Sequence, residues 1–212
     1  MKARHNPFSA DRVETIRYRP VGATFAGILA RLEAMNYRAA IVGPQGAGKT
    51  TLLEDIQCAL ERRGLRTRMV FINDSSPLDR PTRRQLMSQL TSDEIVLVDG
   101  ADAIGSAMWT LLKHRILRQA AGLVITTHRP GRLPTLIDCV TTPGLLGVIV
   151  GELLPQEYDL EGPTLDRIYH RYQGNIRNCL RELYDLCASD SSYVGSDYLA
   201  DDDWSSMSKL RR

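Results

Sequence analysis

Eight consecutive residues, Gly43 to Thr50, place three glycines, a lysine and a threonine in the order Gly-Pro-Gln-Gly-Ala-Gly-Lys-Thr. This run fits the pattern G-x-x-x-x-G-K-[ST] of a phosphate-binding loop. Glycines let the backbone turn so that successive N–H groups point at phosphate oxygens, and a helix that begins there adds partial positive charge. The sequence therefore predicts a site for the phosphates of a nucleotide.

The residues of this loop have separate expected roles. Lys49 is expected to reach the β- and γ-phosphates, and the Thr50 hydroxyl to hold Mg²⁺. The expected cofactors are ATP (or ADP) and Mg²⁺, because the Asn-Lys-x-Asp motif that reads guanine is absent from the sequence. The nucleotide-binding residues predicted in the loop are Gly43, Pro44, Gln45, Gly46, Ala47, Gly48, Lys49, Thr50 and Thr51.

A second apolar run, Ile95 to Val98, ends on Asp99 and has the form of a Walker B element. The Asp99 carboxylate is expected to help to hold Mg²⁺ through water. Many hydrolysing P-loop ATPases carry Glu directly after this Asp, but here the next residue is Gly100. The nearest acid, Asp102, is either a catalytic base or the cap of a helix that begins near Ile104.

A third apolar run, from Leu123, ends on the polar residues Thr126, Thr127 and His128. A hydroxyl or an imidazole there is placed to sense a γ-phosphate and to orient water. Thr127 is preferred over His128, because a single His is usually a surface or capping residue. A plain strand end before a loop has the same appearance, and that alternative stays open.

Strands alternate with helices along the chain, which predicts an α/β fold. We expect three layers, with a parallel sheet of about five strands, helices on both faces and a small C-terminal helical lid. In such sheets ligands lie at the carboxyl ends of the strands, so Gly43, Asp99 and Thr127 should converge. The predicted strands are 39–42, 66–72, 94–99, 123–127 and a fifth around Val148–Val150, after a Pro- and Gly-rich loop at 129–143.

The predicted helices flank these strands and continue beyond the fifth. Before and between the strands they cover 25–35, the segment after the phosphate loop as far as Gly64, 83–90 and 104–118, and two more cover 165–172 and 175–187. We divide the chain into a leader at 1–20, a P-loop ATPase core at 21–153, a helical lid at 154–188 and a polar tail at 189–212.

Composition narrows the class of protein. The 212 residues are 43% hydrophobic and 25% charged with a net charge of +2, which is typical of a globular protein and does not favour a generally nucleic-acid-binding surface. No apolar run approaches a membrane span, and no secretory signal is recognisable at the start. Cys58, Cys139, Cys179 and Cys187 lack C-x-x-C spacing, so we expect reduced thiols in a cytoplasmic protein with no membrane association.

One further motif, Gly174-Asn175-Ile176-Arg177, opens an amphipathic helix near the end of the chain. Together with the loop, the Walker B run and the polar strand end, it makes the sequence from about Val21 to Leu186 resemble the AAA+ ATPases. The resemblance implies that Thr127 acts as sensor 1 and that Arg177 contacts the γ-phosphate as sensor 2. Arg177 as an ordinary surface arginine is the alternative.

The same resemblance carries three further implications. It places the adenine near Ile16 and Tyr18 of the leader. It also suggests a homo-oligomer in which one subunit supplies an arginine to its neighbour, without choosing among Arg115, Arg118, Arg129 and Arg132. The sequence departs from the family in lacking Glu after Asp99 and in having a short lid segment between Gly151 and Gly174.

Three functions are consistent with these residues. The first is a slow Mg²⁺-dependent ATPase that couples nucleotide state to a change of conformation, with Lys49, Asp99, Asp102 and Thr127 as its catalytic residues. The second is a nucleotide-gated switch or adaptor with little hydrolysis, which Gly100 favours. The third is a small-molecule kinase that uses basic residues such as Arg83. A protein partner, or a DNA partner bound through the Arg-rich helix around Arg83, stays open.

Overall fold

The computed structural model describes residues 6–73, 78–79, 84, 86, 90–154 and 162–189. The predicted helix at 83–90 lies largely outside these residues, and so does the predicted tail beyond Ser189. The strands are β1 (Arg38–Val42), β2 (Arg66–Phe71), β3 (Glu94–Asp99), β4 (Gly122–Thr127) and β5 (Thr135–Asp138). The helices are α1 (Ala10–Val13), α2 (Phe25–Ala34), α3 (Lys49–Arg62), η2 (Ala101–Ala103), α5 (Ser106–Gln119), α6 (Pro143–Leu153), α7 (Gly162–Arg171) and α8 (Ile176–Ser189).

The five strands form one sheet in the order β2-β3-β4-β1-β5, and every neighbouring pair is parallel. Parallel sheets need helical crossovers, so both faces become covered and the central strands are apolar throughout. This is the predicted fold class, an α/β sheet with a helical lid, and the structure confirms it. β1 and β4 are adjacent strands, and the sequence placed in the site both Gly43, which follows β1, and Thr127, which ends β4.

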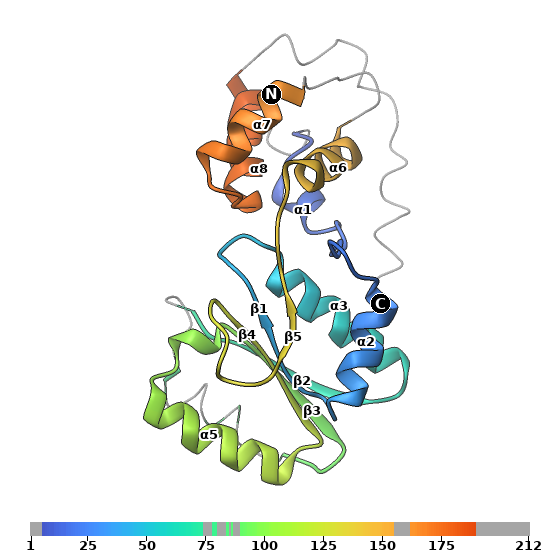
Figure 1. The fold of residues 1–212 in the computed structure, drawn as a ribbon, viewed down its shortest axis with the longest axis vertical. Helices are drawn as coiled ribbons and strands as arrows, with labels where there is room; N and C mark the ends of the chain where they lie inside the picture. The colour runs from blue at the N-terminus through green and yellow to red at the C-terminus, as the bar shows by residue number, and fades with distance from the viewer. Residues whose placement is uncertain are drawn as a thin grey trace.

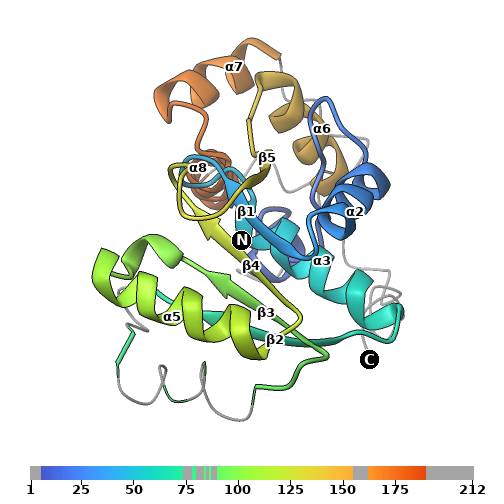
Figure 2. The ribbon, with the colours of Figure 1, turned by 60° about the horizontal axis from the view of Figure 1, so that its bottom comes forward.

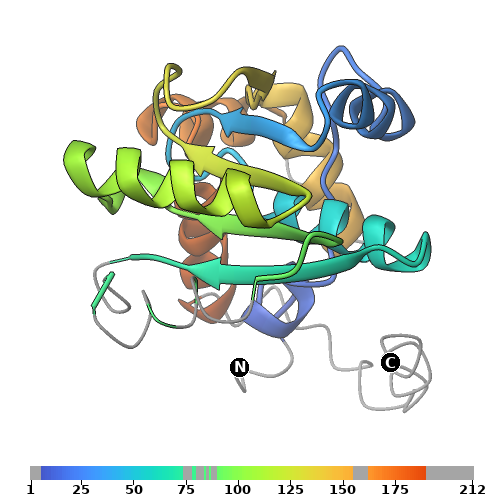
Figure 3. The same cartoon turned by 90° about the horizontal axis from the view of Figure 1, so that it is seen from below.

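Alternate residues of each strand face opposite helical layers. On one face Val96, Val98 and Ile125 pack with Trp109, Leu112 and Ile116 of α5. On the other face Ile95, Leu97 and Val124 pack with α2 and α3, including Leu32, Leu52 and Ile56. Figures 2 and 3 show α5 on one side of the sheet and α2 and α3 on the other.

The lid has a hydrophobic core of its own. α6, α7 and α8 enclose a separate cluster of buried side chains that includes Leu146, Ile149, Leu165 and Leu183. Figure 1 shows these helices gathered at the end of the molecule to which the β1–α3 loop points, together with α1 of the leader. The leader joins this cluster through Phe8, which is 3% exposed.

The predicted fifth strand around Val148–Val150 is wrong, because this segment is helix α6. A short run of β-branched residues cannot be distinguished from a buried helix by composition alone. The Thr142 hydroxyl accepts a hydrogen bond from the Leu145 N–H at 3.1 Å and so caps the helix, with Pro143 at its first position. Its buried residues, Leu146, Ile149, Val150 and Leu153, follow helical spacing.

The actual fifth strand, β5, lies inside the segment predicted as a loop. It pairs with β1 at the edge of the sheet, and only Leu136 of its residues is fully buried. The chain then passes directly from β5 into α6, which packs with α7 and α8. This packing favours a lid that starts near Pro143 instead of at residue 154, and that division of the chain is a proposal.

The structure bears on two expectations from composition, reduced cysteines and the lack of a membrane span. All four cysteines are free, with Cys139, Cys179 and Cys187 buried and Cys58 partly so. In the described part of the chain, no helix combines the length and apolar character that crossing a membrane would require.

Candidate nucleotide-binding site

The predicted phosphate loop connects β1 to α3, as the sequence pattern requires. Gly46 and Gly48 have φ values of +76° and +79°, a conformation that side-chain-bearing residues rarely adopt. Gly48 directly precedes the first residue of α3, a helix of 14 residues. The helix N-terminus therefore points its free N–H groups and partial positive charge into the loop, which makes a ready anion site.

The Lys49 ammonium lies inside the curve of this loop. Its Nζ donates to the carbonyl oxygens of Gly43 at 2.8 Å and Pro44 at 2.7 Å. Burial lowers the pKa of Lys49, the nearby carboxylates of Asp99 and Asp102 counteract that effect, and the Arg177 guanidinium adds to it. Residues from the loop, from the segment after β3 and from the lid thus lie within electrostatic reach of one ammonium group.

A hydrogen-bonded chain joins Thr50 to the end of β3. The Thr50 hydroxyl donates to Asp99 Oδ2 at 2.8 Å, and the Thr126 hydroxyl donates to Asp99 Oδ1 at 2.5 Å. Thr126 also accepts the Gly100 N–H at 2.8 Å. Both oxygens of the Asp99 carboxylate are therefore held, one by α3 and the other by β4.

Thr50 and Asp99 fit the requirements of a Mg²⁺ site. Mg²⁺ prefers oxygen ligands and is usually held by one or two protein groups together with phosphate oxygens and water. Among the described residues there is no group of three or more His, Cys, Asp or Glu side chains that would hold a metal by themselves. A bound Mg²⁺ would take the Thr50 hydroxyl and, through water, the Asp99 carboxylate, and would neutralise phosphate charge.

Thr126 is a site residue that the sequence analysis missed. Val98 pairs with Ile125, so the next residues, Asp99 and Thr126, lie side by side on adjacent strands. Both side chains are on the face of the sheet that is covered by α3. Thr127 follows Ile125 on the opposite face, is 1% exposed and donates to the Arg129 carbonyl oxygen at 2.9 Å. The register between β3 and β4 is set by the sheet, so the sequence carries no signal that separates Thr126 from Thr127 as the partner of Asp99.

Asp102 contacts the loop after β4 and not the helix that follows it. Its Oδ2 accepts the backbone N–H of His128 at 2.5 Å and lies 2.9 Å from His128 Nδ1. The residue before α5 is Gly105, and no side chain caps that helix. The capping alternative for Asp102 is therefore wrong. Its role as a base stays a prediction.

The lid touches the phosphate loop through Asn175, the residue that precedes α8. A Cβ atom added to Gly46 would lie only 1.9 Å from Asn175 Oδ1, so the two residues are in close contact. The same oxygen accepts the Asn178 N–H at 3.1 Å and caps α8. Arg177 lies in the first turn of α8 with its side chain exposed.

The turn before α8 is tied to the segment that leads from β5 into the lid. The Thr141 hydroxyl donates to the Gly174 carbonyl oxygen at 2.9 Å, and the Tyr169 hydroxyl donates to the Thr141 carbonyl oxygen at 2.8 Å. Any rotation of the lid about this segment therefore moves Asn175 relative to Gly46.

The leader lies beside the loop and contacts both core and lid. Asp55 of α3 accepts the Tyr18 N–H at 2.9 Å and the Arg17 guanidinium at 2.5 Å. The Tyr18 ring packs on Gly48, where an added Cβ would lie 3.2 Å from Tyr18 Cδ2. Burial and a hydrogen bond to Cys139 raise the pKa of Tyr18.

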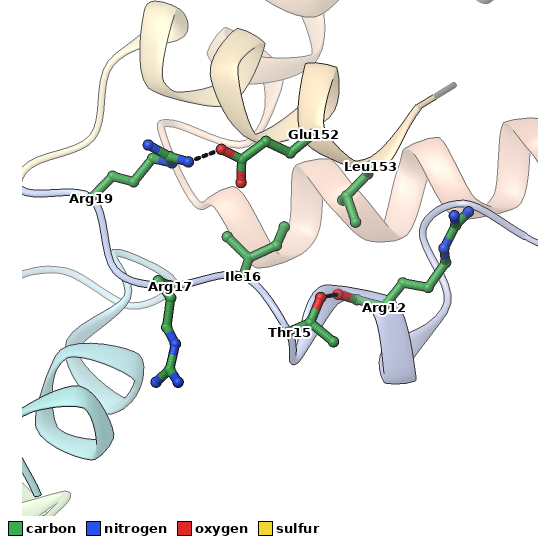
Figure 4. Close-up of a pocket in the computed structure, with 7 residues that line it drawn as sticks. All are labelled: Arg12, Thr15, Ile16, Arg17, Arg19, Glu152 and Leu153. Carbon is green, nitrogen blue, oxygen red and sulfur yellow. Dashed lines mark hydrogen bonds and ion pairs between the residues drawn. The ribbon is translucent and has the colours of Figure 1, made fainter. Parts of the chain in front are cut away.

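A small cavity separates the leader from α6. Figure 4 shows Ile16 between the two segments, with Arg19 paired to Glu152 of α6. None of the residues that line this cavity belongs to the phosphate loop. The position of the adenine near Ile16 and Tyr18 stays a prediction.

The strand order, the loop after β1, the carboxylate that ends β3 and the helical lid match the fold of AAA+ P-loop ATPases. No family model matches this sequence, and no curated protein is similar to it in sequence. Solved structures are nevertheless similar in fold. The RuvB Holliday junction branch migration motor of Thermotoga maritima has a TM-score of 0.53 and 21% identity, over 76% of this chain and 61% of RuvB.

Two further AAA+ P-loop ATPases with solved structures have the same fold. AMPPCP-bound DnaA from Aquifex aeolicus has a TM-score of 0.52 and 15% identity, over 83% of this chain and 64% of DnaA. NtrX from Brucella abortus, in complex with ATP, has a TM-score of 0.51 and 11% identity, over 93% of this chain and 60% of NtrX. The present chain therefore spans less than two thirds of the length of each of these proteins.

Proposed function

We propose that this chain binds ATP with Mg²⁺ and hydrolyses it slowly, and that nucleotide state controls the position of its helical lid. The observation that carries this proposal is the 2.8 Å hydrogen bond between the Thr50 hydroxyl and Asp99 Oδ2. It brings the two expected Mg²⁺ groups together next to the Lys49 ammonium and the N-terminus of α3. A phosphate chain placed there meets backbone N–H groups, an ammonium and a metal-binding pair at once.

The lid supplies the proposed coupling. Asn175 contacts Gly46 of the phosphate loop, and Arg177 lies close enough to influence the pKa of Lys49. A γ-phosphate bound near Lys49 would therefore attract Arg177 and shift the first turn of α8. Release of that phosphate after hydrolysis would remove the attraction, which is how nucleotide state would move the lid.

The experiment that tests the site compares Mg-ATP with metal-free ATP. Thr50→Ala removes an inner ligand, and Asp99→Ala removes a carboxylate that acts through water. Both variants should weaken Mg-ATP binding much more than binding of ATP in EDTA, as measured by calorimetry. Equal losses in the two conditions would show that the Mg²⁺ site lies elsewhere. Unchanged binding of Mg-ATP and of metal-free ATP would contradict the proposed nucleotide site itself.

A second candidate function, a nucleotide-gated switch with little hydrolysis, is favoured by the backbone at Gly100. Its φ is +78°, and an added Cβ would lie 2.0 Å from the Ile72 carbonyl oxygen. The position after Asp99 thus has no room for the Glu that many hydrolysing P-loop ATPases carry there. A turnover assay with labelled ATP decides between the two functions, because the switch binds ATP and leaves it intact.

A DNA partner and a homo-oligomer are proposed on weaker grounds than the nucleotide site. RuvB is a Holliday junction branch migration motor, and a DNA partner for the present chain rests on that similarity of fold alone. The Arg-rich segment around Arg83, which the sequence offered as a DNA contact, lies largely outside the described residues. Repeating the turnover assay with added DNA, and measuring the oligomeric state with and without ATP, tests both proposals.

A further inference from the structure

The Walker B run lacks an adjacent acid, but a histidine and a carboxylate meet beside it. His128 Nδ1 lies 2.9 Å from Asp102 Oδ2, and the same oxygen accepts the His128 backbone N–H at 2.5 Å. The backbone hydrogen bond and the Nδ1 contact both go to Asp102 Oδ2, so the imidazole lies against this carboxylate. Asp102 comes from η2 after β3, and His128 from the residue after β4.

This pair lies at the edge of the sheet where the nucleotide site is. β4 lies between β3 and β1, so its carboxyl end is flanked by Asp99 and by the start of the phosphate loop. Asp102 is also near enough to Lys49 for its carboxylate to counteract part of the lowering of the Lys49 pKa that burial causes. The His128 side chain is 53% exposed, so solvent water reaches its ring.

The contact favours one of the two ring nitrogens as the base. An ionised carboxylate only accepts hydrogen bonds, so Asp102 Oδ2 at 2.9 Å from Nδ1 favours the tautomer with its hydrogen on Nδ1. In the neutral imidazole this leaves Nε2 with a free lone pair, directed away from Asp102. A histidine oriented in this way by a carboxylate is an effective general base.

We propose that His128 is the general base for ATP hydrolysis and that Asp102 is its positioning residue, in place of the absent acid after Asp99. This inference rests on the proposed ATPase function. The water oxygen forms a bond to the γ-phosphorus, and the bond from that phosphorus to the β,γ-bridging oxygen breaks, leaving ADP. The water proton passes to His128 Nε2, the Asp102 carboxylate stabilises the resulting imidazolium, and the proton then leaves to solvent.

Two simpler roles make different predictions. If Asp102 is itself the base, His128 only holds it in place. If the contact is purely structural, it braces the loop after β4 and affects folding alone. His128→Asn distinguishes these cases, because the Asn amide can still donate to Asp102 from a position close to that of Nδ1 and offers no basic nitrogen.

The first measurement needs no nucleotide. NMR of the ring nitrogens in the full chain should find neutral His128 with its hydrogen on Nδ1 and with Nε2 unprotonated. Asp102→Asn removes the charge that selects this tautomer, so the ring should shift toward the Nε2–H form. A wild-type ring with its hydrogen on Nε2 overturns the proposal, whatever the turnover.

The second measurement is ATP turnover, with Mg-ATP affinity determined on the same samples. His128→Asn and His128→Ala should both lower turnover roughly tenfold or more, and leave affinity nearly unchanged. Asp102→Asn should lower turnover too. His114→Asn, on the exposed side of α5, is the matched control and should behave as the wild type does.

The outcomes separate this inference from the proposed function. Wild-type turnover that His128→Asn preserves overturns the role of His128 alone; a loss confined to His128→Ala and Asp102→Asn would instead identify Asp102 as the base. A wild-type protein that binds Mg-ATP and never hydrolyses it overturns the ATPase function together with this base, and leaves the nucleotide switch.

Discussion

Asn175 of the lid occupies the space that a side chain at Gly46 would need. A Cβ atom at Gly46 would lie 1.9 Å from Asn175 Oδ1 and 2.5 Å from its Cγ. Two independent features therefore require glycine at position 46: its φ of +76° and the closeness of the lid. One contact thus joins the phosphate loop to the first turn of the helix that carries Arg177.

Gly46→Ala should destabilise the protein by more than its backbone strain alone. A non-glycine residue in this conformation costs about 1–2 kcal/mol. Gly64→Ala measures that cost by itself, because Gly64 has a φ of +77° and nothing within 4 Å of an added Cβ. Adding Asn175→Gly to Gly46→Ala should recover the excess, since Gly replaces an Asn cap at little cost. Urea unfolding of the single and double variants measures the coupling, and simple additivity would contradict the contact.

Lys49→Ala should abolish most nucleotide binding while the fold is retained. A hydrogen bond to a charged group contributes roughly 1.5–3 kcal/mol, so ATP affinity should fall about tenfold or more. Calorimetry measures the affinity, and circular dichroism checks that the variant is folded. Lys113→Ala, in α5 and away from the loop, is the matched lysine control. The same ATP affinity in wild type and Lys49→Ala would refute the phosphate loop.

Arg177→Ala should reduce the preference for ATP over ADP. The arginine is expected to contact the γ-phosphate, which ADP lacks, so ADP affinity should change little. Competition binding of the two nucleotides gives the ratio, and Arg181→Ala, exposed one turn further along α8, serves as the control. If both nucleotides bind Arg177→Ala less tightly by the same factor, Arg177 is an ordinary surface arginine.

Thr126→Val should weaken Mg-ATP binding more than Thr127→Val does. The first change removes the donor to Asp99 and leaves the Gly100 N–H without its acceptor, which costs about 1–3 kcal/mol of stability. The second removes a hydroxyl that bonds the Arg129 carbonyl oxygen on the other face of the sheet. Mg²⁺ titrations at fixed ATP compare the two, and a larger effect from Thr127→Val would restore Thr127 as the sensing residue.

Gly100→Ala should be poorly tolerated, and Gly100→Glu will not supply the missing acid. The Cβ of either residue would lie 2.0 Å from the Ile72 carbonyl oxygen, and the φ of +78° adds about 1–2 kcal/mol. Gly22→Ala, at a φ of +72° with open space around it, is the control for the φ effect. In thermal unfolding, the melting temperature of Gly100→Ala should be well below that of Gly22→Ala. Equal melting temperatures would mean that the backbone at Ile72, after β2, moves aside at little cost.

Local patterns were sufficient for most of the fold and for the centre of the site. A buried parallel strand is a short apolar run, and a phosphate loop is defined by adjacent residues, so β1, β3, β4 and the Gly43–Thr50 loop follow from nearby sequence. Asp99 follows as well, because it directly ends an apolar run. These features depend on residues that are close in the chain.

The remaining features depend on which segments pack together, and tertiary structure decided them. The run at Val148–Val150 suits a strand or a buried helix equally, and packing against α7 and α8 made it α6. Thr126 became the partner of Asp99 through the register of two strands far apart in sequence. His128 and Asp102 meet because β3 and β4 end side by side, and no property of either residue alone specifies that contact. The pattern of apolar residues depends only on residues close together in the chain. The contacts across the sheet and within the lid depend on how distant segments pack.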